Sequence, residues 1–190
     1  GGIYRFTVDV TKGNTKAVLT VEKIGKVDLP APDIFFGNDK MEVTDTDIYK
    51  SEQVFTQGQM ITVTGIDNLN EWWIDPDFFE KQSDGALKFL PINGDYRVTA
   101  NAVLKYFSVM ALKDGKPAKL QDDGTGAIWA IGKGIGKPSV ASSEVGWEPG
   151  KALCLAQVAP KKYQLTLKAG ETLKTSGDWE AISFKFFHQN

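Results

Sequence analysis

The chain has 190 residues, with 22 Lys and Arg against 24 Asp and Glu, and a formal net charge of −2 at pH 7. This near-balance argues against a nucleic-acid partner, because basic patches supply most of that affinity. The single cysteine, Cys154, and the single histidine, His188, exclude a disulfide framework and a metal site built from several such residues. They also disfavour a Ser-His-Asp or Cys-His catalyst.

The dominant sequence period is two, which predicts strands with one buried face and one solvated face. The clearest alternating segments are residues 4–10, 17–22, 163–168 and 182–186. Shorter predicted strands cover residues 34–36, 59–64, 87–90, 97–100, 102–112, 128–131 and 153–158. Turns rich in Gly, Asn and Asp separate them, and the best helical candidate is a short one that begins at Asp75 and Pro76. The pattern predicts an all-β chain built from β-sandwiches.

The chain contains an internal repeat. Residues 2–7 and residues 94–99 share the pattern Gly-x-Tyr-Arg-x-Thr, and the spacing of roughly ninety residues matches one small sandwich. We therefore expect two tandem Ig-like β-sandwich domains, residues 1–93 and 94–190. The alternative is that the two segments are strands of one larger sandwich.

The second half also carries an ordered series of motifs. The first motif is an apolar strand that ends at a glycine (residues 127–132), and the Gly146-Trp147 loop follows it. Next come a Leu-x-Leu-x-x-Gly strand (residues 165–170) and a Phe-Lys-Phe strand (residues 184–186). This order resembles the glycan-binding modules of Bacteroidetes outer-membrane starch-utilisation proteins of the SusE/SusF type. The first half resembles, more weakly, a divergent Ig-like companion domain. Modules of that family continue beyond the Phe-Lys-Phe strand, so the resemblance implies a second module truncated at its C-terminal end.

The resemblance implies a function in polysaccharide utilisation. It indicates non-catalytic binding of a poly- or oligosaccharide by a Bacteroides lipoprotein exposed on the outer membrane, as part of a glycan-uptake system with other outer-membrane proteins. The membrane anchor would lie outside this sequence, and neither a cofactor nor a metal ion is implied. The alternative is a structural spacer module of a surface lipoprotein without a ligand of its own, and a glycosidase fragment ranks last.

The tryptophans are the main candidate binding residues, because the C–H face of a sugar stacks on an aromatic ring. Trp147 lies in a loop and Trp179 follows a turn, positions that favour binding. Trp129 lies inside an apolar strand, where a core role competes with ligand contact. Neighbours in an extended segment point to opposite sides, so one of Trp72 and Trp73 can be core while the other is exposed.

Three lysines are the candidates for bonding sugar hydroxyls. Lys133 and Lys137 lie in the glycine-rich segment 132–137, which lacks the spacing of a phosphate-binding loop and is interpreted as a mobile loop. Lys174 lies close to Trp179 in sequence.

The carboxylates give only a weak signal for catalysis. Glycosidases hold two acids ~5–9 Å apart across the sugar, and Asp75 and Asp77 are one pair close in sequence. Asp75 is better explained as a helix cap beside Pro76. Cys154 lies in an apolar strand and is expected to be a buried, unreactive thiol.

Overall fold

The computed structural model describes residues 2–11, 16–26, 32–175 and 181–188. It separates into two compact units, Gly1–Pro32 and Asp33–Asn190. Strands account for 53% of the structure and helices for 6%, far below the ~30–35% helix of an average globular domain. The all-β prediction is therefore confirmed. Across these four described ranges, no helix is long and apolar enough to cross a membrane.

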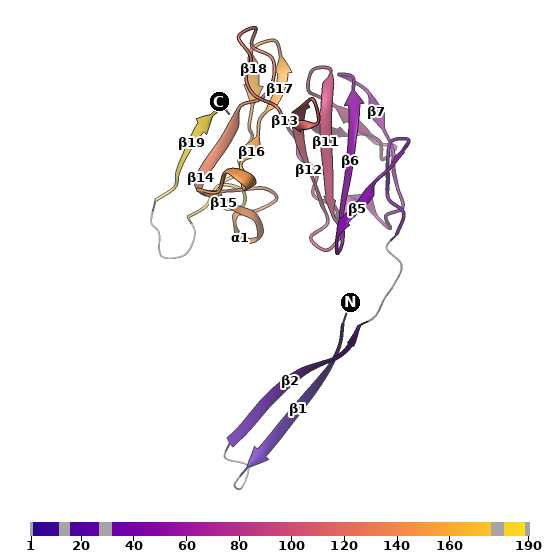
Figure 1. Ribbon diagram of the computed structural model, residues 1–190, viewed down its shortest axis with the longest axis vertical. Helices are drawn as coiled ribbons and strands as arrows, with labels where there is room; N and C mark the ends of the chain where they lie inside the picture. The colour runs from indigo at the N-terminus through magenta and orange to yellow at the C-terminus, as the bar shows by residue number, and fades with distance from the viewer. Residues whose placement is uncertain (1, 12–15, 27–31, 176–180, 189–190) are drawn as a thin grey trace. The chain divides into compact units, whose positions relative to one another are not determined.

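The first unit is an antiparallel hairpin of β1 (Gly2–Thr11) and β2 (Lys16–Lys26) (Figure 1). The predicted alternation holds, because Phe6 lies opposite Val21 and Val8 opposite Leu19. The predicted burial does not hold, because these apolar side chains are exposed. A two-stranded ribbon has no second layer with which to cover a face of its own.

The second unit is built around a five-stranded antiparallel sheet in the order β13-β12-β11-β6-β5. Figure 1 shows its four longer strands side by side. The strands are β5 (Glu42–Asp45), β6 (Ile48–Phe55), β11 (Gly94–Asn101), β12 (Tyr106–Lys113) and β13 (Lys116–Pro117).

Two small sheets complete this sandwich, in the orders β4-β3-β8 and β7-β10-β9. Their strands are β3 (Phe35–Phe36), β4 (Asp39–Lys40), β7 (Met60–Ile61), β8 (Val63–Thr64), β9 (Phe79–Lys81) and β10 (Leu87–Phe89). Aromatic rings from the small sheets meet rings of the large sheet in the core. The ring centroids of Phe36 and Phe107 are 5.3 Å apart, and those of Phe89 and Tyr96 are 4.9 Å apart.

The predicted domain boundary between residues 93 and 94 is corrected by this sheet. Gly94 begins β11 and lies opposite Phe55 of β6, so strands from both predicted domains pair within one sheet. One buried core likewise joins residues on both sides of the boundary, such as Phe36 and Phe107. A central strand needs a partner at each edge, and β11 takes β6 on one side and β12 on the other. The compact units divide after Pro32 instead.

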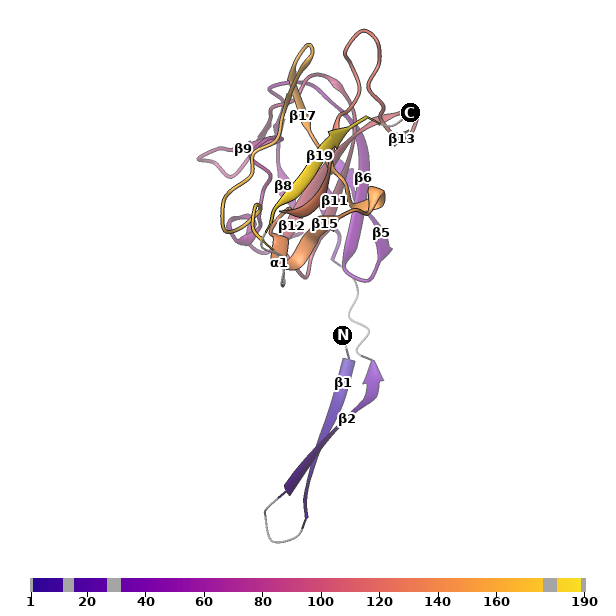
Figure 2. The ribbon, with the colours of Figure 1, turned by 90° about the vertical axis from the view of Figure 1, so that its left-hand side faces the viewer.

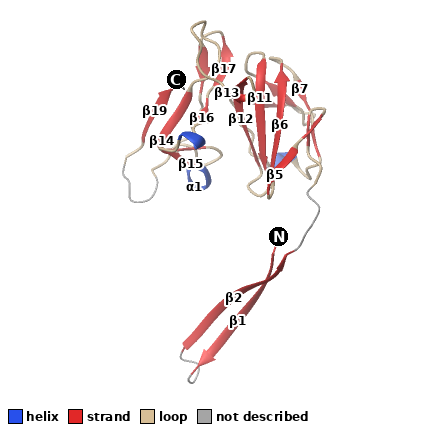
Figure 3. Ribbon diagram, in the orientation of Figure 1, coloured by secondary structure: helices blue, strands red, loops and turns tan. Residues whose placement is uncertain are grey.

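The rest of the second unit is centred on β14 (Trp129–Gly136). β15 (Glu144–Gly146) and β16 (Leu153–Cys154) pair with β14, as does β19 (Ser183–Phe187), which is yellow in Figure 2. A further hairpin joins β17 (Ala156–Ala159) and β18 (Lys162–Gln164). The helical segments, blue in Figure 3, are short: α1 (Val140–Ser143), η1 (Leu69–Glu71) and η2 (Pro149–Lys151).

The glycine-rich segment is a buried strand, not the predicted mobile loop. A Cβ atom on Gly132 would lie 2.3 Å from Cα of Phe184 in β19, and one on Gly136 would lie 2.5 Å from the carbonyl oxygen of Ser143. Glycine at these positions lets the neighbouring backbones approach β14. The expected helix at Asp75 is a single turn, in which the backbone N–H of Phe79 donates to the carbonyl oxygen of Asp75.

Candidate functional site

The second unit contains a cleft of about 600 Å³, within the ~300–1,000 Å³ range of small-molecule sites. One wall comes from the start of β12 and the segment before Asp75, and the other comes from α1, η2 and β16. The residues used below are Trp73, Tyr106, Ser108, Ser142, Glu144 and Lys151. We call this site the central cleft.

Two aromatic residues lie next to each other in the central cleft. The backbone N–H of Trp73 donates to the carbonyl oxygen of Lys105 (2.8 Å), and the N–H of Phe107 donates to the carbonyl oxygen of Trp73 (3.3 Å). These bonds fix Trp73 beside Tyr106, and both side chains are half-buried. The preceding Trp72 points the other way and stacks on the Phe107 ring, with centroids 4.7 Å apart. The prediction that one of the two tryptophans is core and the other accessible is confirmed.

The opposite wall of the central cleft is polar. Ser142 is exposed, and its hydroxyl oxygen lies 2.9 Å from that of Ser139. Lys151 is also exposed and pairs with Glu148 at 2.9 Å. Residues with hydroxyl and ammonium groups therefore line the same cleft as the two aromatic residues, so a ligand with both C–H surface and hydroxyl groups fits its chemistry.

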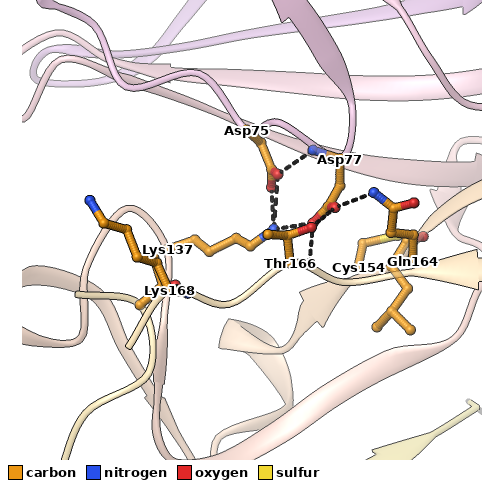
Figure 4. A network of polar contacts seen from close by, with 9 residues as sticks. Asp75, Asp77, Lys137, Cys154, Gln164, Thr166 and Lys168 are labelled. Atoms are coloured by element: carbon orange, nitrogen blue, oxygen red, sulfur yellow. Dashed lines mark hydrogen bonds and ion pairs between the residues drawn. The ribbon is translucent and has the colours of Figure 1, made fainter. Parts of the chain in front are cut away.

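A buried ion cluster borders the central cleft. The ammonium of Lys137 donates to both carboxylate oxygens of Asp75 (2.9 Å each) and to Oδ2 of Asp77 (2.7 Å), as Figure 4 shows. The Lys137 side chain is only 7% exposed, and its three N–H donors are all used. Lys137 was predicted to bond sugar hydroxyls. Its ammonium has no donor left for a sugar, so this prediction is corrected.

The two carboxylates of the cluster differ in their environment. Burial raises the pKa of Asp75, and the Lys137 ammonium only partly opposes this effect. Burial also acts to raise the pKa of Asp77, but Lys137 and the bonds from Thr166 outweigh it, so that this pKa is lowered. The backbone N–H and the hydroxyl of Thr166 each donate to Asp77 at 2.6 Å, and Gln164 donates at 2.9 Å. Both carboxylates are therefore engaged in holding segments of the chain together.

Trp129 and Cys154 are core residues. The Trp129 ring is 3% exposed, and its indole N–H donates to the carbonyl oxygen of Ala118 (3.1 Å). The predicted sugar contact for Trp129 is corrected, because the ring is packed and its polar atom is satisfied inside the protein. Cys154 is buried, as predicted, and burial raises its thiol pKa to about 12.

The other predicted site residues that the structure describes, Trp147, Lys133 and Lys174, lie on β14 or next to segments bonded to it. Trp147 is 49% exposed, and the Lys185 ammonium lies 5.9 Å from its ring centroid. Lys133 is half-buried in β14, whereas Lys174 is exposed and its backbone N–H donates to the carbonyl oxygen of Gly134. Trp179 lies outside the described residues.

Sequence reasoning missed Tyr106 and Lys185. It named Trp73 without making it a candidate site residue. No local pattern connects Trp73 with Tyr106, because the bonds that join them cross between distant segments. Lys185 belongs to the predicted Phe-Lys-Phe strand, but its contact with Trp147 depends on the pairing of β19 with β14.

Comparison with known families gives two matches. Residues 14–120 match the model of a domain of unknown function, DUF5125, and residues 123–190 match that of a second domain of unknown function, DUF5121. Neither a curated protein nor a solved structure matched the chain.

Proposed function

The chain belongs to the DUF5125 family, and we propose that this member binds a carbohydrate, without cleaving it, in the central cleft. The observation that carries the proposal is the pair of adjacent, half-buried aromatic residues, Trp73 and Tyr106, opposite a wall of hydroxyl and ammonium groups. A sugar ring presents C–H bonds on its faces and hydroxyls around its rim. It can stack on the aromatic wall while its hydroxyls bond to Ser142 and Lys151.

The absence of catalysis is part of the same proposal. Glycoside hydrolysis requires one carboxyl group that gives a proton and a second that acts as base or nucleophile. Of the carboxylates beside the cleft, Asp75 shares the Lys137 ammonium with Asp77. The side chain of Glu144 accepts a hydrogen bond from the backbone N–H of Gly134 (3.0 Å). These bonds serve the fold, which favours binding over chemistry.

The proposed cellular setting is supported by the resemblance to SusE/SusF modules and by the two matched families, which are typically found in Bacteroidetes surface proteins. We place the protein on the outer membrane, exposed at the cell surface, within a polysaccharide-uptake system. Its partners there would be poly- or oligosaccharides and other uptake proteins, and the anchor would lie outside this sequence.

Affinity electrophoresis through gels that contain neutral polysaccharides tests the proposal. The wild-type chain should be retarded by at least one polysaccharide. Trp73→Ala and Tyr106→Ala should each weaken binding about tenfold, which corresponds to ~1.4 kcal/mol. Trp147→Ala is the matched control, because it removes a large, accessible ring that does not line the cleft.

The alternatives give different results. If Trp147→Ala abolishes retardation while Trp73→Ala does not, the binding surface is the one formed by Trp147 and Lys185. If the wild-type chain ignores a broad panel of polysaccharides, the spacer function is favoured. Release of soluble sugar during incubation would instead indicate a glycosidase.

A further inference from the structure

The β1–β2 hairpin carries an uncovered apolar face. Direct cross-strand pairing places six large apolar side chains on this face, and each is between 51% and 66% exposed. They are Tyr4, Phe6, Val8, Val10, Leu19 and Val21. A contiguous apolar patch of this kind marks an interaction surface, and an isolated two-stranded hairpin is only marginally stable in water.

The hairpin has a structural counterpart within the same chain. Phe6 lies opposite Val21 in the first hairpin, as Val98 lies opposite Val109 in the β11–β12 hairpin. One step along, Val8 faces Leu19 as Ala100 faces Phe107. The sequence repeat Gly-x-Tyr-Arg-x-Thr thus has the same cross-strand register in both copies.

A glycine–tyrosine contact supports this correspondence. A Cβ atom on Gly2 would lie 2.8 Å from the ring of Tyr4, and one on Gly94 would lie 3.4 Å from the ring of Tyr96. In both hairpins the tyrosine ring lies against the glycine two residues earlier. The two copies therefore agree in local packing as well as in register.

The counterpart hairpin shows how this face is covered in a complete sandwich. Five of the six equivalent residues are only 0–8% exposed: Tyr96, Val98, Ala100, Phe107 and Val109. In addition, β11 pairs with β6 at its second edge, whereas among the described strands β1 pairs with β2 alone. Within the described part of the chain, the first hairpin therefore has neither a covering layer nor an edge partner.

We propose that β1–β2 is the closing hairpin of another β-sandwich, and that the missing strands are supplied by a domain that precedes residue 1 in a longer polypeptide. The repeat also indicates on which side of the hairpin the missing strands lie in the sequence. In the second unit, β5 and β6 complete the sheet of β11 and precede β11 in the chain. The strands that complete the sheet of β1 are therefore expected before β1. The second unit does not supply these strands, because the position beside β6 is already occupied by its own β11–β12 hairpin.

The second unit shows how the strand beside β1 should pair. β11 pairs antiparallel with β6, and Arg97 lies directly opposite Glu52, with its guanidinium 2.7 Å from that carboxylate. Arg5 occupies the position equivalent to Arg97, but it already has an acidic partner within the hairpin, because its guanidinium lies 3.4 Å from the Glu22 carboxylate of β2. The missing strand is therefore specified by its antiparallel pairing with β1 and not by a charge opposite Arg5.

Hydrogen exchange measured by NMR tests this proposal. The experiment compares residues 1–190 with the same polypeptide extended upstream by one domain of roughly ninety residues. The backbone N–H groups of β1 should be protected at least a hundredfold more strongly in the extended protein. Phe6→Asp should abolish this added protection. Thr20→Asp is the matched control and should leave it intact, because Thr20 faces the other side of the hairpin and its counterpart Ser108 is exposed.

The protection of β11 serves as an internal standard for folding in each variant. The proposal is overturned if the coding sequence contains no upstream domain, or if the extension adds no protection to β1. It is also overturned if β1 is already fully protected in residues 1–190. In that case, dimerisation in sedimentation would identify a second copy as the occupant, and a monomer would identify the chain's own second unit.

Discussion

The ammonium nitrogen of Lys137 lies 2.7 Å from Oδ2 of Asp77, and this contact joins residues 60 positions apart in sequence. Lys137 follows β14, whereas Asp77 lies in the turn after Trp73. The same ammonium also binds Asp75, so one buried cation bridges two carboxylates beside the central cleft. The part of the chain matched by DUF5125 and the part matched by DUF5121 are thereby tied together.

Loss of the buried cation should destabilise the second unit strongly. Lys137→Met leaves Asp75 and Asp77 buried without their counter-ion, which is expected to cost about 3–5 kcal/mol in the free energy of unfolding. Urea denaturation measures this change. Lys88→Met is the control, because the Lys88–Glu80 pair is exposed and is expected to contribute less than about 1 kcal/mol. Equal effects of the two substitutions would contradict a structural role for the cluster.

The stabilising effect of Asp77 should depend on pH. Its pKa is lowered in the folded state, so the ionised form contributes stability above the unfolded value of ~4, and this contribution disappears as the pH falls through the folded pKa. The difference in unfolding free energy between wild type and Asp77→Asn should therefore shrink as the pH is lowered from about 5 towards 2. Denaturation at a series of pH values measures it.

Asp75 provides the comparison for this pH effect, because burial raises its pKa. Its ionised form is disfavoured by folding, so Asp75→Asn should not reduce the loss of stability in acid. A difference between wild type and Asp77→Asn that stays constant across the whole pH range would be incompatible with the lowered pKa of Asp77.

Trp129 and Trp147 should respond in opposite ways to truncation. Trp129→Ala removes a buried ring and a satisfied indole N–H, which is expected to cost about 3–5 kcal/mol. Trp147→Ala removes an exposed ring and should leave the melting temperature almost unchanged. Thermal unfolding followed by circular dichroism separates the two. Similar melting temperatures for both variants would show that Trp129 is not a core residue.

The thiol of Cys154 should be unreactive in the folded protein. Burial raises its pKa to about 12 and also blocks access to reagents, and the thiolate is the reactive form. An aromatic disulfide reagent at pH 8 should release less than about a tenth of an equivalent of thiolate in an hour from the native protein. It should release one equivalent after unfolding in guanidinium. Rapid release from the native protein would place Cys154 at an accessible position.

The sequence alone determined the fold class, because the local alternation of apolar and polar residues, together with the turn residues between them, predicts strands. Residues 183–186 of the predicted strand 182–186 are a strand in the structure, whereas the predicted strand 163–168 is extended into a strand only up to Gln164. The repeat was also visible, and both copies form the same hairpin. The sequence also allowed one of Trp72 and Trp73 to be core and the other exposed, since neighbouring side chains in an extended segment point to opposite sides, and in the structure Trp72 is the buried one.

Tertiary structure alone decided which hairpin is buried, where the units divide and which residues meet at the cleft. The pattern Gly-x-Tyr-Arg-x-Thr is identical in β1 and β11, yet only β11 has β6 at its second edge and a layer over its apolar face. The sequence places Lys137 among glycines, but in the structure its ammonium is bound by Asp75 and Asp77. Trp73 lies beside Tyr106 only because backbone hydrogen bonds join these two distant segments. Local pattern fixes the direction in which a side chain points, but its partner comes from long-range packing, which no single segment encodes.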